Sequence, residues 1–303
     1  MSAADAPGTG SDPRASVRRR IFVAGAGLMG SGIAAQCALA GYAVTLEDVT
    51  EALAAKGLEN AKRALEHAAR KGRIGEGDRD AAIAAIDPAI GLRRAEGASF
   101  VVEAAPERLD LKRAVFSELD RIVGPETILA SNTSSLPITS IASAVADPGR
   151  VVGIHFFNPV LQMALVEVIP GLKTRPETVE AATVFAKSLG KTVVGSRDTP
   201  GFVTTRALAV LGNEAAWMLY EGISSKEEID VAYKLGFGHP MGPFELLDLV
   251  GLDTTVAILD VLWDGYRDPK YRTCPILRSM VAAGDLGRKS GRGFYEYPRP
   301  PGA

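Results

Sequence analysis

The sequence predicts an α/β domain built on a parallel sheet, followed by an all-helical domain. Over the first two thirds of the chain, short apolar runs alternate with helical segments, as in a sheet covered by helices on both faces. A glycine-rich turn joins the first apolar run to a helix. After the turn cluster at 198–201 only helical segments follow. We therefore predict domains at 17–199 and 200–303, after a disordered tail at residues 1–16.

Apolar runs and helical periodicity define the expected elements. The expected strands cover residues 21–24, 43–46, 99–102, 127–130, 151–154 and 165–169. The expected helices of the first domain cover 31–40, two segments within 51–86, 108–123 and 176–189. Those of the second domain cover 202–221, 226–235, where Ser225 and Glu228 form a capping box, and 243–263, which begins at Pro243. The segment 51–86 is a long helical excursion between two strands.

Composition excludes several classes of function. The 303 residues carry a formal net charge of −2, which gives no indication of a nucleic-acid or membrane surface. No apolar stretch reaches the about 18 residues of a membrane span. The tail lacks the apolar region of a signal peptide. Cys37 and Cys274 lie far apart without metal-ligand spacing, which predicts two free thiols, no metal and a cytoplasmic location.

A glycine motif, Gly25-Ala26-Gly27-Leu28-Met29-Gly30, follows the first expected strand and opens a helix. In this context Gly25 permits a tight turn, Gly27 lets the backbone approach a pyrophosphate, and Gly30 allows close packing of helix and strand. Asp48 ends the second expected strand, where a carboxylate binds the ribose hydroxyls of NAD. The pattern predicts an NAD site. The alternative is a glycine turn beside an incidental surface acid.

Hydroxyl side chains cluster at Ser131–Ser135, directly after the strand expected at 127–130. Ligands of an open α/β sheet bind at the carboxyl ends of its strands, so these hydroxyls could bind a substrate oxygen. A helix cap or an ordinary loop explains the same composition.

A second pair of polar residues interrupts apolar strands. Glu167 lies within the run 165–169, and a carboxylate there is rarely buried without a partner. His155 ends another apolar strand, and Asn158-Pro159 turns the chain between the two. A histidine held by a carboxylate is a general acid–base arrangement, and a purely structural buried pair is the alternative.

Taken together, these motifs resemble the L-3-hydroxyacyl-CoA dehydrogenase family. The matching segments are GAGLMGSGIA at 25–34, VVEAAPE at 101–107, SNTSSLPI at 131–138, HFFNP at 155–159, LVEV at 165–168, DTPGFV at 198–203, GHPMGPFELLDLVGLD at 238–253 and LGRKSGRGFYEY at 286–297. The resemblance implies a Rossmann-type N-terminal domain and an all-α C-terminal domain that forms a homodimer. It also implies reversible, NAD-dependent oxidation of the 3-hydroxyl of an L-3-hydroxyacyl-CoA to a 3-ketoacyl-CoA, and we expect a short-chain substrate such as 3-hydroxybutyryl-CoA.

The resemblance also assigns roles to individual residues. His155 would be the general base, Glu167 its orienting partner, and Ser134 a hydrogen-bond partner of the substrate oxygen. Thr205 stands where the family commonly has Asn, and its shorter side chain keeps one donor and one acceptor. The positions implied near the cofactor, besides the glycine turn with Leu28 and Met29, are Glu107, Lys112 and Lys289. The positions implied near the acyl-CoA are Asn158 and, on the helical excursion, Lys62, Arg63, Arg70 and Lys71.

Two alternatives to this function stay open. One is a related dehydrogenase of a free hydroxy acid, similar to gulonate or carnitine dehydrogenases. The intact HFFNP and MGPFELLD segments argue against this alternative and favour the CoA thioester. The other is a non-catalytic NAD-binding protein similar to the lens crystallins of this family. The retained Ser134, His155 and Glu167 argue against that second alternative.

Overall fold

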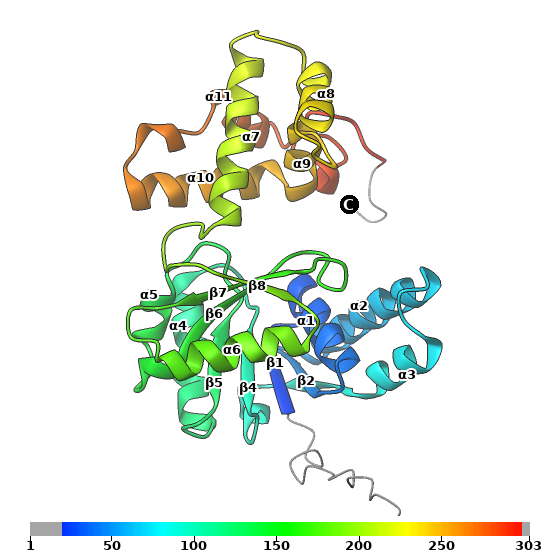
Figure 1. Ribbon diagram of the computed structural model, residues 1–303, viewed down its shortest axis with the longest axis vertical. Coiled ribbons are helices and arrows are strands. Elements are labelled where there is room, and N and C mark those ends of the chain that lie inside the picture. The colour runs from blue at the N-terminus through cyan, green and yellow to red at the C-terminus, as the bar shows by residue number, and fades with distance from the viewer. Residues whose placement is uncertain (1–19, 299–303) are drawn as a thin grey trace, which may run out of the picture. The chain divides into compact units, whose positions relative to one another are not determined.

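A computed structural model of the protein describes residues 20–298, so the tail expected at 1–16 lies outside the described residues. The chain forms two compact units (Figure 1). The first contains the residues up to Thr133 together with Ile138–Gly195. The second contains Ser134–Pro137 and the residues from Ser196 onward.

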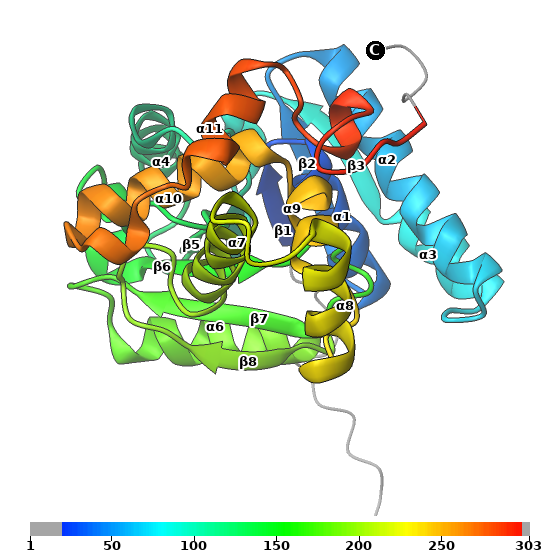
Figure 2. The same cartoon turned by 90° about the horizontal axis from the view of Figure 1, so that it is seen from above.

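The first unit is built on an eight-stranded sheet in the order β3-β2-β1-β4-β5-β6-β7-β8 (Figure 2). Every described neighbouring pair is parallel except β6 and β7, which run antiparallel. The strands are β1 (Arg20–Ala24), β2 (Ala43–Asp48), β3 (Ile86–Ile90), β4 (Phe100–Glu103), β5 (Ile128–Ser131), β6 (Val151–Phe156), β7 (Leu165–Pro170) and β8 (Thr192–Gly195). This confirms the expected α/β class.

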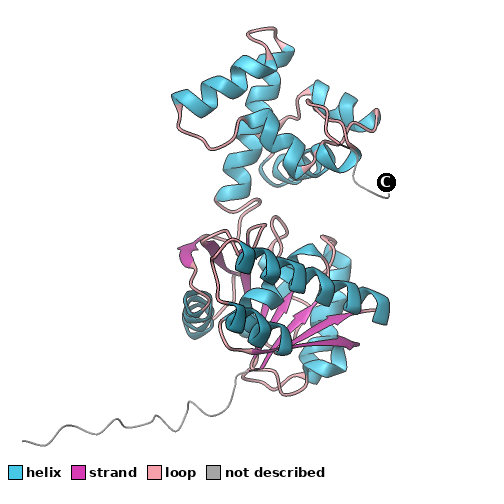
Figure 3. Cartoon of the chain, turned by 90° about the vertical axis from the view of Figure 1, so that its right-hand side faces the viewer, coloured by secondary structure: helices cyan, strands magenta, loops and turns pink. Residues whose placement is uncertain are grey.

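Helices lie on both faces of this sheet (Figure 3). They are α1 (Leu28–Leu39), α2 (Glu51–Arg70), α3 (Glu76–Ala84), α4 (Leu109–Ile122), α5 (Ile138–Ala142) and α6 (Pro176–Ser188). Ile33 of α1, Leu65 of α2 and Phe185 of α6 belong to one buried core with the central strands. The helical excursion expected between two strands is therefore the pair α2 and α3, which packs on α1.

Two strands of the first unit differ from the expectation, because β3 and β8 were not predicted. Both lie at an edge of the sheet, where one side of a strand has no neighbour. β3 contains Pro88 and exposes three of its five residues, and β8 is mostly exposed. Edge strands tolerate proline and polar residues, so neither shows the apolar run that marks a central strand.

The second unit is helical, as expected, with α7 (Thr204–Tyr220), α8 (Lys226–Gly236), α9 (Pro243–Val250), α10 (Leu252–Tyr266) and α11 (Pro275–Ala282). The capping box of Ser225 and Glu228 is confirmed at the start of α8. The prediction of one helix over 243–263 is wrong. Gly251 has φ +100°, a conformation that side-chain-bearing residues rarely adopt, and it separates α9 from α10. Among residues 20–298, no helix has the length and apolarity needed to cross a membrane.

Candidate active site

The glycine turn between β1 and α1 combines two tightly packed positions with one open position. Gly25 has φ +97°, and a Cβ atom there would lie 2.8 Å from the carbonyl oxygen of Ala104. A Cβ on Gly30 would lie 1.7 Å from the carbonyl oxygen of Gly25. A Cβ on Gly27, the N-cap of α1, would meet no described atom within 4 Å. The backbone at Gly27 is thus accessible at a helix N-terminus, as binding of a pyrophosphate requires.

Asp48 closes the other side of this turn from the end of β2. Its carboxylate accepts hydrogen bonds from the backbone N–H groups of Ala26 and Val49, both at 2.8 Å. Glu47 beside it is buried, and burial, together with the charge of Asp48, raises the pKa of Glu47 to about 7. The carboxylate held at the turn is therefore that of Asp48. An open helix N-terminus and a fixed carboxylate at the end of β2 fit a dinucleotide.

Glu103, which the sequence reasoning missed, ends β4 and is 0% exposed. One carboxylate oxygen accepts from Lys112 Nζ at 2.6 Å and from the backbone N–H of Ala105 at 2.7 Å. The other accepts from the Ser131 hydroxyl at 2.6 Å. Burial raises the pKa of Glu103, and the ammonium of Lys112 opposes that rise. An acid that ends an apolar strand was the signal used for Asp48, and it would also have found Glu103.

Glu107 extends this network toward solvent. One oxygen of its carboxylate lies 3.4 Å from Lys112 Nζ, and the other accepts from the Thr133 hydroxyl at 2.5 Å. The side chain of Lys112 is 1% exposed, whereas that of Glu107 is 39% exposed. Glu107 and Lys112 were both expected near the cofactor; Glu107 thus presents its carboxylate at the surface, and the buried Lys112 contacts it from below.

His155 and Glu167 face each other across the antiparallel strands β6 and β7, at the same register position. Both are buried, and His155 Nδ1 lies 2.8 Å from a carboxylate oxygen of Glu167. A hydrogen bond at Nδ1 orients the ring and selects Nε2 as the atom that could exchange a proton with a ligand. The ring of Phe157 packs on the imidazole with centroids 4.4 Å apart.

Asn132 ties the loop after β5 to the end of the histidine strand. Its side-chain oxygen accepts a hydrogen bond from the backbone N–H of Phe156 at 2.9 Å, one residue after His155. The carboxyl ends of β2, β4, β5 and β6 thus carry Asp48, Glu103, Asn132 and His155 along one edge of the sheet, as the topology of an open α/β sheet predicts for a ligand site.

Comparison with known proteins identifies the family. Residues 20–199 match the NAD binding domain of 3-hydroxyacyl-CoA dehydrogenase, and residues 201–297 match its C-terminal domain. The chain belongs to the 3-hydroxyacyl-CoA dehydrogenase family.

Similar proteins cover nearly the whole chain. A probable 3-hydroxybutyryl-CoA dehydrogenase of Bacillus subtilis is 50% identical over 279 residues, which are 92% of this chain and 97% of that protein. The 3-hydroxybutyryl-CoA dehydrogenase of Bradyrhizobium diazoefficiens is 45% identical, over 93% and 97% of the two chains. The crystal structure of (S)-3-hydroxybutyryl-CoA dehydrogenase from Ralstonia eutropha superposes with a TM-score of 0.89 at 43% identity, covering 93% of this chain and 100% of that one.

On the first unit of this dehydrogenase, the residues expected near the acyl-CoA lie on α2 and on the turn after β6. A cavity of about 180 Å³ is lined by residues of both, including Asn60 and His67 of α2 and Asn158 of the turn. Lys62 pairs with Glu59 at 2.7 Å, and Arg63 donates to the side chain of Asn60 at 2.5 Å. These two cations lie on the same helix as the cavity but do not line it. Arg70 and Lys71 are exposed at the end of α2.

The second unit carries the remaining expected residues. Ser134 belongs to this unit and is half-buried. Thr205 is the second residue of α7 and is also half-buried. Lys289 forms an ion pair of 2.6 Å with Asp253 near the start of α10.

Proposed function

We propose that this dehydrogenase catalyses the reversible, NAD-dependent oxidation of an L-3-hydroxyacyl-CoA, with 3-hydroxybutyryl-CoA as its substrate. The observation that carries the proposal is the buried His155–Glu167 pair at the carboxyl edge of the same sheet that holds the open glycine turn. The names of the similar proteins support the short-chain thioester.

In this proposal the chain's own groups bind NAD and move the substrate proton. The backbone at Gly27 with Leu28 and Met29 would hold the pyrophosphate, Asp48 the adenosine ribose, and Glu107 the nicotinamide half. Lys289 is a further residue that we propose for binding the cofactor. NAD, when bound, accepts the hydride that leaves carbon 3 of the substrate.

His155 would accept the proton of the 3-hydroxyl at Nε2 as the carbon–hydrogen bond breaks. The ring then becomes an imidazolium, and the carboxylate of Glu167, 2.8 Å from Nδ1, stabilises that charge. In the reverse direction the same imidazolium returns the proton to the developing alkoxide. Ser134 would hydrogen-bond the substrate oxygen, with Thr205 in place of the family's usual Asn.

The acyl-CoA would lie against α2 and the turn that contains Asn158. The basic residues Lys62 and Arg63 would attract the CoA phosphates, and the cavity between α2 and the turn would take an apolar part of the ligand.

We also propose a homodimer formed through the second unit. Leu235 and Phe237, at the end of α8, are 83% and 67% exposed, and α7 exposes Leu208 and Leu211 one turn apart. Exposed apolar groups of this size favour a protein interface. The two buried free thiols, Cys37 and Cys274, favour a reducing, cytoplasmic location.

The experiment that tests the reaction compares substrates. NADH consumption is followed with acetoacetyl-CoA and, separately, with acetoacetate. The proposal expects turnover with the thioester and none with the free acid at equal concentration. Turnover with the free acid alone would support a dehydrogenase of free hydroxy acids, and turnover with neither would support a non-catalytic protein.

A further inference from the structure

The carboxylate of Glu103 has no part in the proton transfer proposed for His155, yet it occupies the centre of a buried network. Both of its oxygens accept hydrogen bonds from three different segments: α4 through Lys112, the turn after β4 through Ala105, and the end of β5 through Ser131. A buried carboxylate is costly unless it is paired and hydrogen-bonded, as this one is. Glu103 therefore fixes how these segments meet at the edge of the sheet.

The same network determines the position of Glu107. The ammonium of Lys112 forms ion pairs with two carboxylates, that of Glu103 at 2.6 Å and that of Glu107 at 3.4 Å. The Thr133 hydroxyl donates to the other oxygen of Glu107, and the Thr133 backbone N–H donates to the Ser131 hydroxyl at 3.3 Å. Lys112 and Thr133, which both contact Glu107, are thus linked to Glu103, the first directly and the second through Ser131.

The topology places this network beside the cofactor turn. β4 pairs with β1, and the backbone of Ala104 packs against Gly25, where an added Cβ would lie 2.8 Å away. β2 with Asp48 pairs with the opposite side of β1. In a sheet of this order a dinucleotide lies across the first strand, with its adenosine over β2 and its second half over β4.

We propose that Glu103 is a positioning residue that holds Glu107 in place to receive the nicotinamide ribose of NAD. The proposal rests on the NAD-dependent function proposed above. Replacing Glu103 with Gln preserves the shape and removes the charge, so Glu107 becomes the carboxylate nearest to Lys112. The ammonium then draws Glu107 away from Thr133 and from the ligand. The effect is confined to one half of the dinucleotide, since Asp48 and Gly27 do not touch this network.

The test measures binding of NADH and of ADP, which lacks the nicotinamide and its ribose, to the full chain by calorimetry. Glu103→Gln should raise the Kd for NADH about ten-fold and leave the Kd for ADP within about two-fold. An equal loss for both ligands, or no loss for NADH, would overturn the proposal. A wild-type protein that binds neither ligand would instead contradict the NAD-binding function itself.

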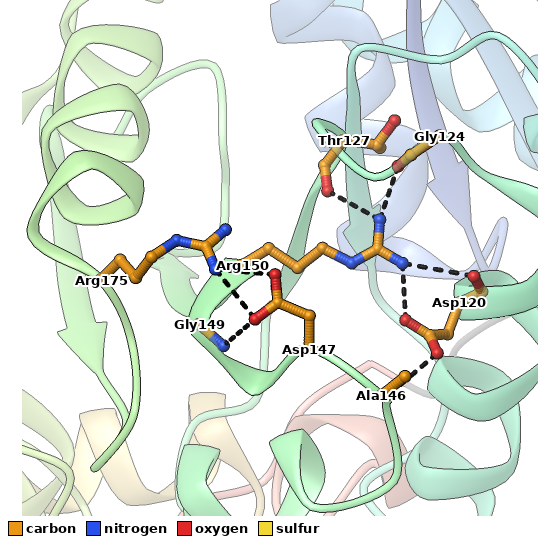
Figure 4. A network of polar contacts seen from close by, with 8 residues as sticks. All are labelled: Asp120, Gly124, Thr127, Ala146, Asp147, Gly149, Arg150 and Arg175. Carbon is orange, nitrogen blue, oxygen red and sulfur yellow. Dashed lines mark hydrogen bonds and ion pairs between the residues drawn. The ribbon is translucent and has the colours of Figure 1, made fainter.

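A matched control exists at the other end of the sheet. Arg150, just before β6, is buried and bonds Asp120 of α4 at 2.5 Å and the carbonyl oxygen of Gly124 at 2.6 Å, as Figure 4 shows beside the exposed pair of Asp147 and Arg175. Asp120→Asn also removes one charge from a buried pair, so it should lower the melting temperature and leave both Kd values unchanged. A rise in the Kd for NADH in this control would show that any loss of a buried pair weakens binding, which would overturn the proposal.

A milder variant keeps the test decisive if Glu103→Gln does not fold. Ser131→Ala removes the hydrogen bonds of that hydroxyl with Glu103 and with the Thr133 N–H, and it leaves the pair of Glu103 and Lys112 in place. It should raise the Kd for NADH about three-fold and leave that for ADP unchanged. Unchanged binding of both ligands in a folded Ser131→Ala protein would count against the proposal.

Discussion

Replacing Glu167 with Gln removes a charge from the buried pair and keeps its shape. When His155 takes a proton, the imidazolium and the carboxylate are held together by the 2.8 Å contact at Nδ1. Two unit charges about 4 Å apart at an effective dielectric constant of about 20 attract by about 4 kcal/mol, which is an upper limit for the lost stabilisation of the transition state. The amide can still accept the Nδ1 proton, so the ring keeps its orientation. We therefore expect kcat to fall between about ten- and a thousand-fold.

The assay follows NADH oxidation with acetoacetyl-CoA and melting temperature in parallel. Because the amide keeps the shape of Glu167 and its oxygen can still accept the hydrogen bond from Nδ1–H, the melting temperature should stay within a few degrees of wild type. A purely structural pair makes the opposite prediction, namely a large fall in melting temperature with kcat nearly unchanged. That result would refute the assignment of Glu167 to the reaction.

Three further predictions concern single side chains. Thr205→Val removes the hydroxyl and keeps the shape of the side chain. The kcat/KM for the thioester should therefore fall about three- to twelve-fold, with unchanged affinity for NADH. Unchanged kinetics would show that Thr205 is a helix residue without contact to the substrate. Glu47→Gln should stabilise the protein above pH 7. The pKa of Glu47 is about 7 in the fold and 4.5 otherwise, so in the wild type the unfolded chain releases this proton first and stability declines as pH rises from 4.5 to 7. Urea unfolding at pH 5 and pH 8 gives the difference in free energy of unfolding between the variant and the wild type. This difference should be roughly 2 kcal/mol more favourable to the variant at pH 8 than at pH 5, and an equal difference at both pH values would contradict the reasoning. The hydroxyl of Tyr271 is buried without a hydrogen-bond partner among the described residues. Tyr271→Phe should therefore leave the free energy of unfolding unchanged or raise it by up to about 1 kcal/mol, with an unchanged or higher melting temperature. A clear fall in melting temperature would show that the hydroxyl is hydrogen-bonded.

The central elements of the fold could be predicted because burial on both faces leaves an unmistakable apolar run. Val151–Phe156, in which every residue is buried, is such a strand. The edge strand Ile86–Ile90 could not be predicted, because it holds Pro88 and faces solvent with three residues. The break at Gly251 depends on a left-handed backbone conformation that the helical periodicity of both flanking segments conceals.

The candidate site divides in the same way. His155 and Glu167 could be paired from sequence because each interrupts an apolar strand, and the structure brings them to the same register position. The network of Glu103, Lys112 and Ser131 depends on three segments meeting in space, so no local pattern reveals its partners. Lys112 matched the family by position, but only the structure shows that its charge is enclosed beneath Glu107.

The measurement that tests the account most directly is a single turnover of the NADH-bound His155→Ala protein with acetoacetyl-CoA in a stopped-flow instrument. The account predicts that NADH binds with nearly wild-type affinity, because the glycine turn and Asp48 are unchanged, while NADH oxidation slows by about 10²–10⁴-fold. His239→Ala, which removes a histidine that packs on Tyr233 in the second unit, is the control and should react at the wild-type rate. A His155→Ala protein that oxidises NADH as fast as this control would contradict the central claim that His155 carries the proton.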